Sequence, residues 1–307
     1  GIITLQHTKG KSIPIPTCGR SQKKSFPAGK TKKRSGAMAA LCSPPKPITL
    51  FFLHLLCLLL PGPALARGRH VVSFRDPGLR PSSLLWDPAA QHFLVGSLLR
   101  PFVTSVSDAG VLDTVVADPD LPVGSSFPSL ALDTSRRRLL AVVVAPSSPL
   151  SPAYLAAYDL RSPRPHRRVF LSPLPSSPDE PASPAGVAVD LASGAAYVTS
   201  SAQNIVWKVD PHGEASVFSR SDAFGRGGHR GLAGISHVVK GYLLAVRPAT
   251  GEVFKVDDED GTARTVLIGR KGEGAAGLDS IALRSDGSAA VAGGRVARIV
   301  TSADGWG

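Results

Sequence analysis

The chain has 307 residues and a formal net charge of +12, from 35 Lys and Arg against 23 Asp and Glu. The charge is divided unevenly, because residues 1–66 hold ten basic residues and no acid, whereas residues 67–307 hold 25 basic and 23 acidic residues. The larger part is therefore almost neutral, and it has no basic stripe with interleaved aromatic residues. These features exclude a nucleic-acid-binding domain, so we expect no nucleic-acid partner.

Residues 1–37 form a basic extension that is rich in Lys and Ser. We expect it to be disordered and absent from the mature protein, either as a transit-like extension or as translated upstream sequence. The three cysteines, Cys18, Cys42 and Cys57, all precede Arg67. A mature domain over 67–307 then has no disulfide, no zinc–thiolate site and no cysteine nucleophile.

A signal peptide is predicted over residues 38–66. It begins at Met38, the only methionine, passes Lys46 and the 13-residue apolar run Ile48–Leu60, and ends in the small-residue step Ala64-Leu65-Ala66. This order is typical of a secretory signal, so we expect cleavage after Ala66 and an extracellular protein. The apolar run is shorter than the ~20 residues that cross a bilayer. An uncleaved membrane anchor is the alternative, and a membrane is a partner only in that case.

From residue 67 onward, one pattern of strand, turn, strand, polar loop, strand and turn recurs. The equivalent positions Asp190, His237 and Arg284 are 47 residues apart in both intervals. A fixed period of this size with several short strands per unit is typical of β-propeller blades, so we predict an all-β propeller of four-stranded blades over 67–307. The five visible units are Ser83–Gly110, Ser129–Pro163, Gly186–Gly213, Gly234–Gly261 and Ser280–Gly305.

Several segments within these units resemble a known superfamily. They are RHVVSFRDPGLRPSSLLWDPAAQHFLVGSLL, LAAYDLRS with FLSPLP, VWKVDPHGEASVFSRS, and KGYLLAV with FKVDDEDGTAR. The chain is similar to the senescence-marker-protein/gluconolactonase/luciferin-regenerating-enzyme-like propellers, and most closely to plant secreted members named calcium-dependent phosphotriesterase-like. The resemblance implies a six-bladed ring, so with about five blades visible we expect the last blade to lie beyond Gly307. The alternative is that five blades close with help from the strand His70–Phe74. It also implies one divalent metal in the channel, which activates water or polarises a lactone or ester carbonyl.

The metal ligands that the resemblance implies are mostly missing. The family's glutamate is expected just ahead of Trp86-Asp87, where this chain has serines and leucines. Two asparagine ligands are replaced by Ala185 and Ala233, and only the late aspartate is retained, as Asp279. One carboxylate does not supply the six to eight oxygens that calcium requires. We therefore expect no cofactor, with calcium or another divalent metal bound only if the channel site is functional, and Asp279 is the one candidate ligand.

Other polar motifs have simpler interpretations. The basic run Arg136–Arg138 falls between two predicted strands and is expected to be a solvated turn. The acidic run Asp257–Gly261 occupies a turn position of the repeat, and His229 is a candidate for the edge of the channel. The remaining histidines of the units lack ligand spacing and are expected to be solvated or structural, namely His92, His212 and His237.

Two classes of function follow from these observations. The first is a secreted propeller that serves as a binding or interaction module for an unknown small molecule or protein at the channel face. The second is a metal-dependent hydrolase of lactones or phosphotriesters, with ligands from positions that the repeat does not align. A membrane-anchored propeller differs only in whether the leader is cleaved. The missing ligands favour the first class.

Overall fold

The computed structural model describes residues 2–6, 71–145, 152–177, 179–266, 277–294, 296–302 and 306. Gly1–Thr4 and Val72–Gly307 form one compact unit, and Leu5–Val71 form a second. The predicted signal peptide and residues 7–37 of the extension lie outside the described residues, whereas β1 (Ile2–Gln6) pairs with β2 (Val71–Arg75). Among the residues that are described, no helix is both long and apolar enough to cross a membrane.

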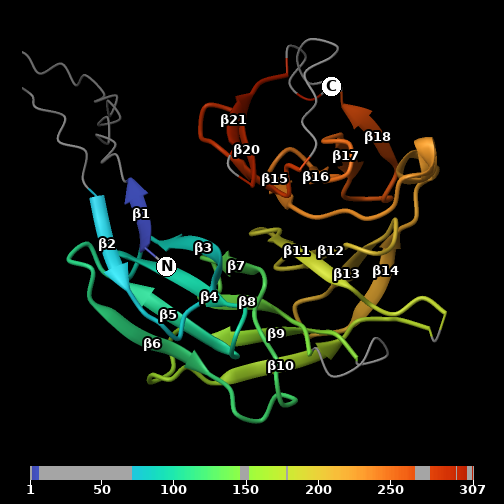
Figure 1. The fold of residues 1–307 in the computed structure, drawn as a ribbon. Helices are drawn as coiled ribbons and strands as arrows, with labels where there is room; N and C mark the ends of the chain where they lie inside the picture. Colours follow the sequence, from blue (N-terminus) through green and yellow to red (C-terminus); the bar gives the residue numbers. More distant parts are fainter. Residues whose placement is uncertain are drawn as a thin grey trace, which may run out of the picture. The chain divides into compact units, whose positions relative to one another are not determined.

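Five consecutive antiparallel sheets form a β-propeller (Figure 1). The first sheet contains β3 (Pro81–Asp87), β4 (His92–Ser97), β5 (Phe102–Val106) and β6 (Leu112–Ala117). The second contains β7 (Leu130–Asp133), β8 (Arg138–Val143), β9 (Tyr154–Asp159) and β10 (Arg168–Pro173). The third contains β11 (Pro184–Val189), β12 (Ala196–Ser200), β13 (Val206–Val209) and β14 (Ala215–Ser219).

The fourth sheet contains β15 (Ile235–Val238), β16 (Tyr242–Val246), β17 (Val253–Asp257) and β18 (Ala263–Val266). The fifth contains β19 (Ser280–Leu283), β20 (Ala289–Gly293) and β21 (Val296–Val300). In the described part of the chain the only helix is the 3-10 segment η1 (Asp222–Gly228), which joins the third sheet to the fourth. The predicted all-β propeller is therefore confirmed, with three described strands rather than four in its fifth sheet.

The second strand of a sheet is the most deeply buried one. Every residue of Arg138–Val143 and of Tyr242–Val246 is buried, because each of these strands has a packed sheet on both faces. Their near-continuous aliphatic sequences suit this position, since neither face meets water. The turn that leads into the second strand holds a left-handed residue in all five sheets, and these residues are Gln91, Arg137, Gly194, Gly241 and Gly287.

The hydrophobic core is divided among the seams between neighbouring sheets. Tyr158 packs edge-on against Phe127 between the first two sheets, and Trp207 is fully buried between the second and third. Phe224 and Phe254 lie in the seam between the third and fourth sheets, and Trp306 lies between the fourth and fifth. A sheet of four short strands cannot bury both of its faces alone, so each blade depends on its neighbours.

Candidate functional site

The first strands of adjacent sheets pack against one another, β3 on β7, β7 on β11, β11 on β15 and β15 on β19. Each of these strands starts at the loop that enters its sheet and finishes at a tight turn into the second strand. The propeller unit therefore has two ends. We call the end where the first strands start the loop end, and the end where they finish the turn end.

Asp279 lies at the loop end, directly before β19. Its backbone N–H donates to the Ala292 carbonyl at 2.9 Å, and its carbonyl accepts from the Gly234 N–H at 2.7 Å, so its position is fixed by two sheets. Its side chain is exposed and accepts a hydrogen bond from the Ser280 hydroxyl at 3.1 Å. The retained aspartate is therefore held in place with its carboxylate open to solvent.

The other positions where the resemblance implies ligands carry no carboxylate or amide side chain. At the start of β3, the Ser83 hydroxyl is buried and has no hydrogen-bond partner in the described structure. Ala185 and Ala233 stand next to Gly186 and Gly234, where the backbones of neighbouring sheets meet closely. A Cβ on Gly234 would lie 2.7 Å from the Ile281 nitrogen, so these positions serve backbone packing.

This donor set does not fit calcium. Alanines contribute no side-chain oxygen, and the Ala233 carbonyl accepts a hydrogen bond from the Thr199 hydroxyl. Across the described residues, no group of three or more His, Cys, Asp or Glu side chains is placed to hold a metal ion. Asp279 and one serine hydroxyl fall well short of a six-oxygen shell.

The loop after η1 is held by hydrogen bonds to the side chain of Asn204, the chain's only asparagine. Asn204 donates from Nδ2 to the His229 carbonyl at 3.3 Å and accepts from the Gly231 N–H at 3.1 Å. The His229 side chain is exposed at this end, and its described hydrogen bond is made by its backbone carbonyl. The loop is thus positioned by backbone contacts that leave the imidazole available.

A buried arginine, which the sequence pattern did not reveal, also lies at the loop end. Arg247 follows β16 and is fully buried, with its guanidinium 4.7 Å from the centre of the Phe254 ring. It donates to Glu252 at 2.8 Å and to the Phe224 carbonyl, so it ties η1 to the fourth sheet. A single basic residue in a strand–turn sequence gives no signal that would have predicted this position.

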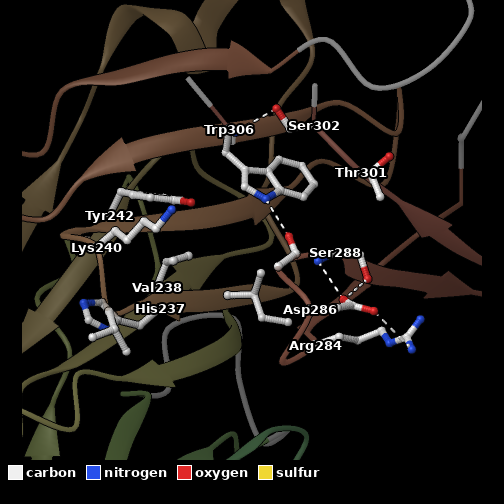
Figure 2. A pocket seen from close by; sticks show the side chains of 13 residues that line it. His237, Val238, Lys240, Tyr242, Arg284, Asp286, Ser288, Thr301, Ser302 and Trp306 are labelled. Atoms are coloured by element: carbon white, nitrogen blue, oxygen red, sulfur yellow. Dashed lines mark hydrogen bonds and ion pairs between the residues drawn. The ribbon is translucent and has the colours of Figure 1, made fainter. Parts of the chain in front are cut away.

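A pocket with a volume of about 560 Å³ opens at the turn end, between the fourth and fifth sheets (Figure 2). Val238, Lys240 and Tyr242 line it from the fourth sheet, and Leu283 and Arg284 line it from the fifth. The sequence repeat did not predict this pocket, because its walls come from two units of the repeat and face each other only after the sheets stack.

Trp306 forms one wall of this pocket and bridges the two sheets. Its indole N–H donates to the Gly287 carbonyl at 3.1 Å, and its own carbonyl accepts from Arg264 at 3.0 Å. The residue is only 3% exposed. Because Gly287 lies in a turn of the fifth sheet and Arg264 in a strand of the fourth, this one residue is hydrogen-bonded to both sheets.

Arg136 and Arg137 of the basic run lie in a turn, as predicted, whereas Arg138 begins β8, and the run is not simply solvated. Arg137 reaches back to the first sheet and donates to both carboxylate oxygens of Asp87, at 2.7 and 2.9 Å. Arg136 reaches forward to the third sheet and donates to the Ala192 carbonyl at 2.9 Å. Arg138 is 8% exposed and donates to the Pro211 carbonyl at 2.9 Å. The expectation was wrong because a linear sequence does not show the acceptors across a seam.

His237 joins the third and fourth sheets at the turn end. Its Nε2 lies 2.9 Å from the Asp258 carboxylate, its Nδ1 lies 3.9 Å from Asp190, and its ring stacks parallel on Tyr197. Burial of the Tyr197 phenol, together with the nearby Asp258 and Asp190 carboxylates, raises its pKa to about 12. His237 is a structural residue in this seam, with its side chain 7% exposed.

Comparisons with known proteins support the fold. No protein-family model matches the chain, and no curated protein matches its sequence. The solved structure of the allergen Mala s 1 from Malassezia sympodialis is similar, with 19% identity, a TM-score of 0.64, and coverage of 75% of this chain and 77% of that one. A virginiamycin B lyase from Staphylococcus aureus matches with 9% identity and a TM-score of 0.54, over 76% and 75% of the two chains.

The luciferin-regenerating enzyme, a member of the superfamily that the sequence resembles, also matches in structure. Its identity is 11% and its TM-score 0.52, over 73% of each chain. All three are β-propellers, and at these identities the likeness is one of fold. The propeller architecture is thereby supported by structure as well as by sequence. The likeness does not extend to the functions of these proteins.

Proposed function

We propose that this chain is a β-propeller that binds a small organic ligand without a catalytic metal. The donor set at the loop end carries this proposal: of the four positions where the resemblance implies metal ligands, Asp279 is the one that carries a carboxylate, and Ala185 and Ala233 occupy two of the others. Loss of those ligands removes the group that would activate water or a carbonyl in the hydrolases of the superfamily.

The pocket at the turn end supplies a place for the ligand. Its volume of about 560 Å³ falls within the range of roughly 300–1,000 Å³ that is usual for small-molecule sites. Its walls combine apolar side chains, among them Val238, Leu283 and Trp306, with polar and charged ones that can orient a ligand. The proposal therefore places binding at the end of the propeller opposite to Asp279.

Metal content and turnover test the proposal. After loading with calcium or zinc, we expect no stoichiometric metal by mass spectrometry and no hydrolysis of a lactone or of paraoxon. Asp279→Ala serves as the matched variant, because this exposed side chain has little structural role. Stoichiometric metal that disappears in Asp279→Ala, together with turnover by the unmutated protein, would establish the hydrolase instead.

We also propose that the chain is one of the plant secreted, phosphotriesterase-like members of the superfamily, and that it is exported from the cell. The arrangement from Met38 to Ala66 supports export through a cleaved signal peptide. Expression of the full chain in a eukaryotic secretory host should yield a soluble product whose N-terminus is Arg67. A product that stays in the membrane fraction with Ile48–Leu60 intact would favour the anchored alternative.

A further inference from the structure

The pocket between the fourth and fifth sheets has an excess of positive charge. Its lining contains two cations, Lys240 and Arg284, and one carboxylate, Asp286. Arg284 lies 3.3 Å from Asp286, which also accepts hydrogen bonds from the N–H and the hydroxyl of Ser288 at 2.9 and 2.5 Å. The single acid of the pocket is thus already neutralised by its own sheet.

Lys240 is the pocket cation that does not take part in the Arg284–Asp286 ion pair. It lies in the turn between β15 and β16, is exposed, and has no carboxylate within 4.0 Å among the described residues. Asp258, an acidic residue of the same sheet, does not line the pocket, and its carboxylate lies 2.9 Å from Nε2 of His237. Lys240 and Arg284 stand on opposite sides of the pocket (Figure 2), so a ligand that reaches Lys240 avoids the Arg284–Asp286 pair.

The surface next to Lys240 is apolar. Val238 and Leu283, which line the pocket, are half-buried, and Tyr242 and Trp306, which also line it, are buried. Val239, adjacent to Lys240 in the turn, is 92% exposed, which leaves a large apolar side chain open to a ligand. An uncharged polar ligand would leave this surface uncovered, and an apolar ligand without charge would leave Lys240 unpaired.

We propose that the pocket binds a small carboxylic acid with an apolar ring or chain. Its carboxylate pairs with the Lys240 ammonium, and its apolar part covers Val238 and Leu283. A monoanion matches a single unpaired ammonium, whereas a phosphate dianion is usually bound by several donors. This assignment rests on the proposed binding function and names the chemical class of its ligand.

Fluorine NMR titration tests the proposal with 4-fluorobenzoate and 4-fluorophenylacetate as probes. The neutral 4-fluorophenylacetamide controls for the charge of the ligand, and phenyl phosphate, added as a competitor of the fluorinated acids, tests the other oxyanion. We expect the acids to bind about tenfold or more tightly than the amide, and Lys240→Ala to reduce their affinity by a similar factor. Arg167→Ala, which removes an exposed cation from the turn end of the second sheet, should change nothing.

Each other outcome overturns the assignment. Equal binding of acid and amide would remove the role of charge, and unchanged affinity in Lys240→Ala with an unchanged melting temperature would remove the role of that residue. Tighter binding of phenyl phosphate would reassign the ligand class, and no binding of either acid at millimolar concentration would reject it. None of these results changes the outcome of the metal and turnover test. The proposed function without a catalytic metal is therefore tested independently of the ligand class.

Discussion

Arg137 and Asp87 form a two-pronged ion pair across the seam between the first and second sheets, with N–O distances of 2.7 and 2.9 Å. The side chain of Asp87 is 2% exposed, so its ionised carboxylate has little contact with water and is stabilised by hydrogen-bond donors of the protein, Arg137 among them. A pair of this geometry fixes both the distance and the angle between two blades, because a planar guanidinium meets a planar carboxylate along two parallel hydrogen bonds.

We predict that Arg137→Ala lowers the free energy of unfolding by about 3 kcal/mol, since it leaves a buried carboxylate without its partner. Arg137→Lys keeps the charge but loses the second hydrogen bond, so an intermediate loss is expected. Urea denaturation of the three proteins measures the difference. A loss below about 0.5 kcal/mol in the alanine variant would mean that the pair behaves like an ordinary surface ion pair.

Stability should fall in acid for the same reason. Burial alone would raise the pKa of Asp87, but hydrogen bonds from Arg137 and from the Ala89 N–H outweigh it and lower the pKa below its ordinary value. A carboxylate whose pKa is lower in the folded state stabilises the fold above its unfolded pKa of about 3.9, and this contribution is lost as the pH falls through the folded value. Asp87→Asn should show a shallower decline in melting temperature below about pH 4. An identical decline would assign the acid sensitivity to other groups.

Trp306 is predicted to hold the fifth sheet on the fourth. Trp306→Ala removes a side chain that is 3% exposed and should cost about 3–5 kcal/mol. Trp306→Phe keeps an aromatic ring but loses the hydrogen bond to Gly287, so a smaller loss is expected, including about 1 kcal/mol for that bond. Thermal melts of both variants provide the measurement, and equal melting temperatures for all three proteins would contradict the bridging role.

Gly186 is predicted to be required for the close approach of the third and fourth sheets. A Cβ at this position would overlap the Ala233 carbonyl oxygen, so Gly186→Ala should destabilise the protein by about 1–3 kcal/mol or more. Gly225→Ala is the matched control, because a Cβ there meets no atom within 4 Å. Chemical denaturation compares the two variants. Similar stabilities would show that the backbones separate without cost.

The architecture could be predicted from the sequence, because a propeller repeats its strands and turns at a nearly constant period. The turns at Asp190 and Arg284 recur in the structure at equivalent ends of their sheets. The partners of Arg136 and Arg138 could not be predicted, since the carbonyls that they contact lie more than 50 residues away in another sheet. The pocket beside Lys240 was missed for the same reason: periodicity describes a blade, whereas a pocket between blades depends on how two of them meet.

The hydrophobic core is divided into separate clusters at the seams, so the stability of each blade depends mainly on the blades next to it. Among the described residues, four clusters connect five sheets, and the second, third and fourth sheets each take part in two of them. In such a nearest-neighbour system the cost of opening a blade depends on how many packed interfaces break with it and on how deeply its strands are buried. Every residue of β12 is buried, whereas β20 is only partly buried, so the amide protons of β20 should exchange with solvent sooner than those of β12.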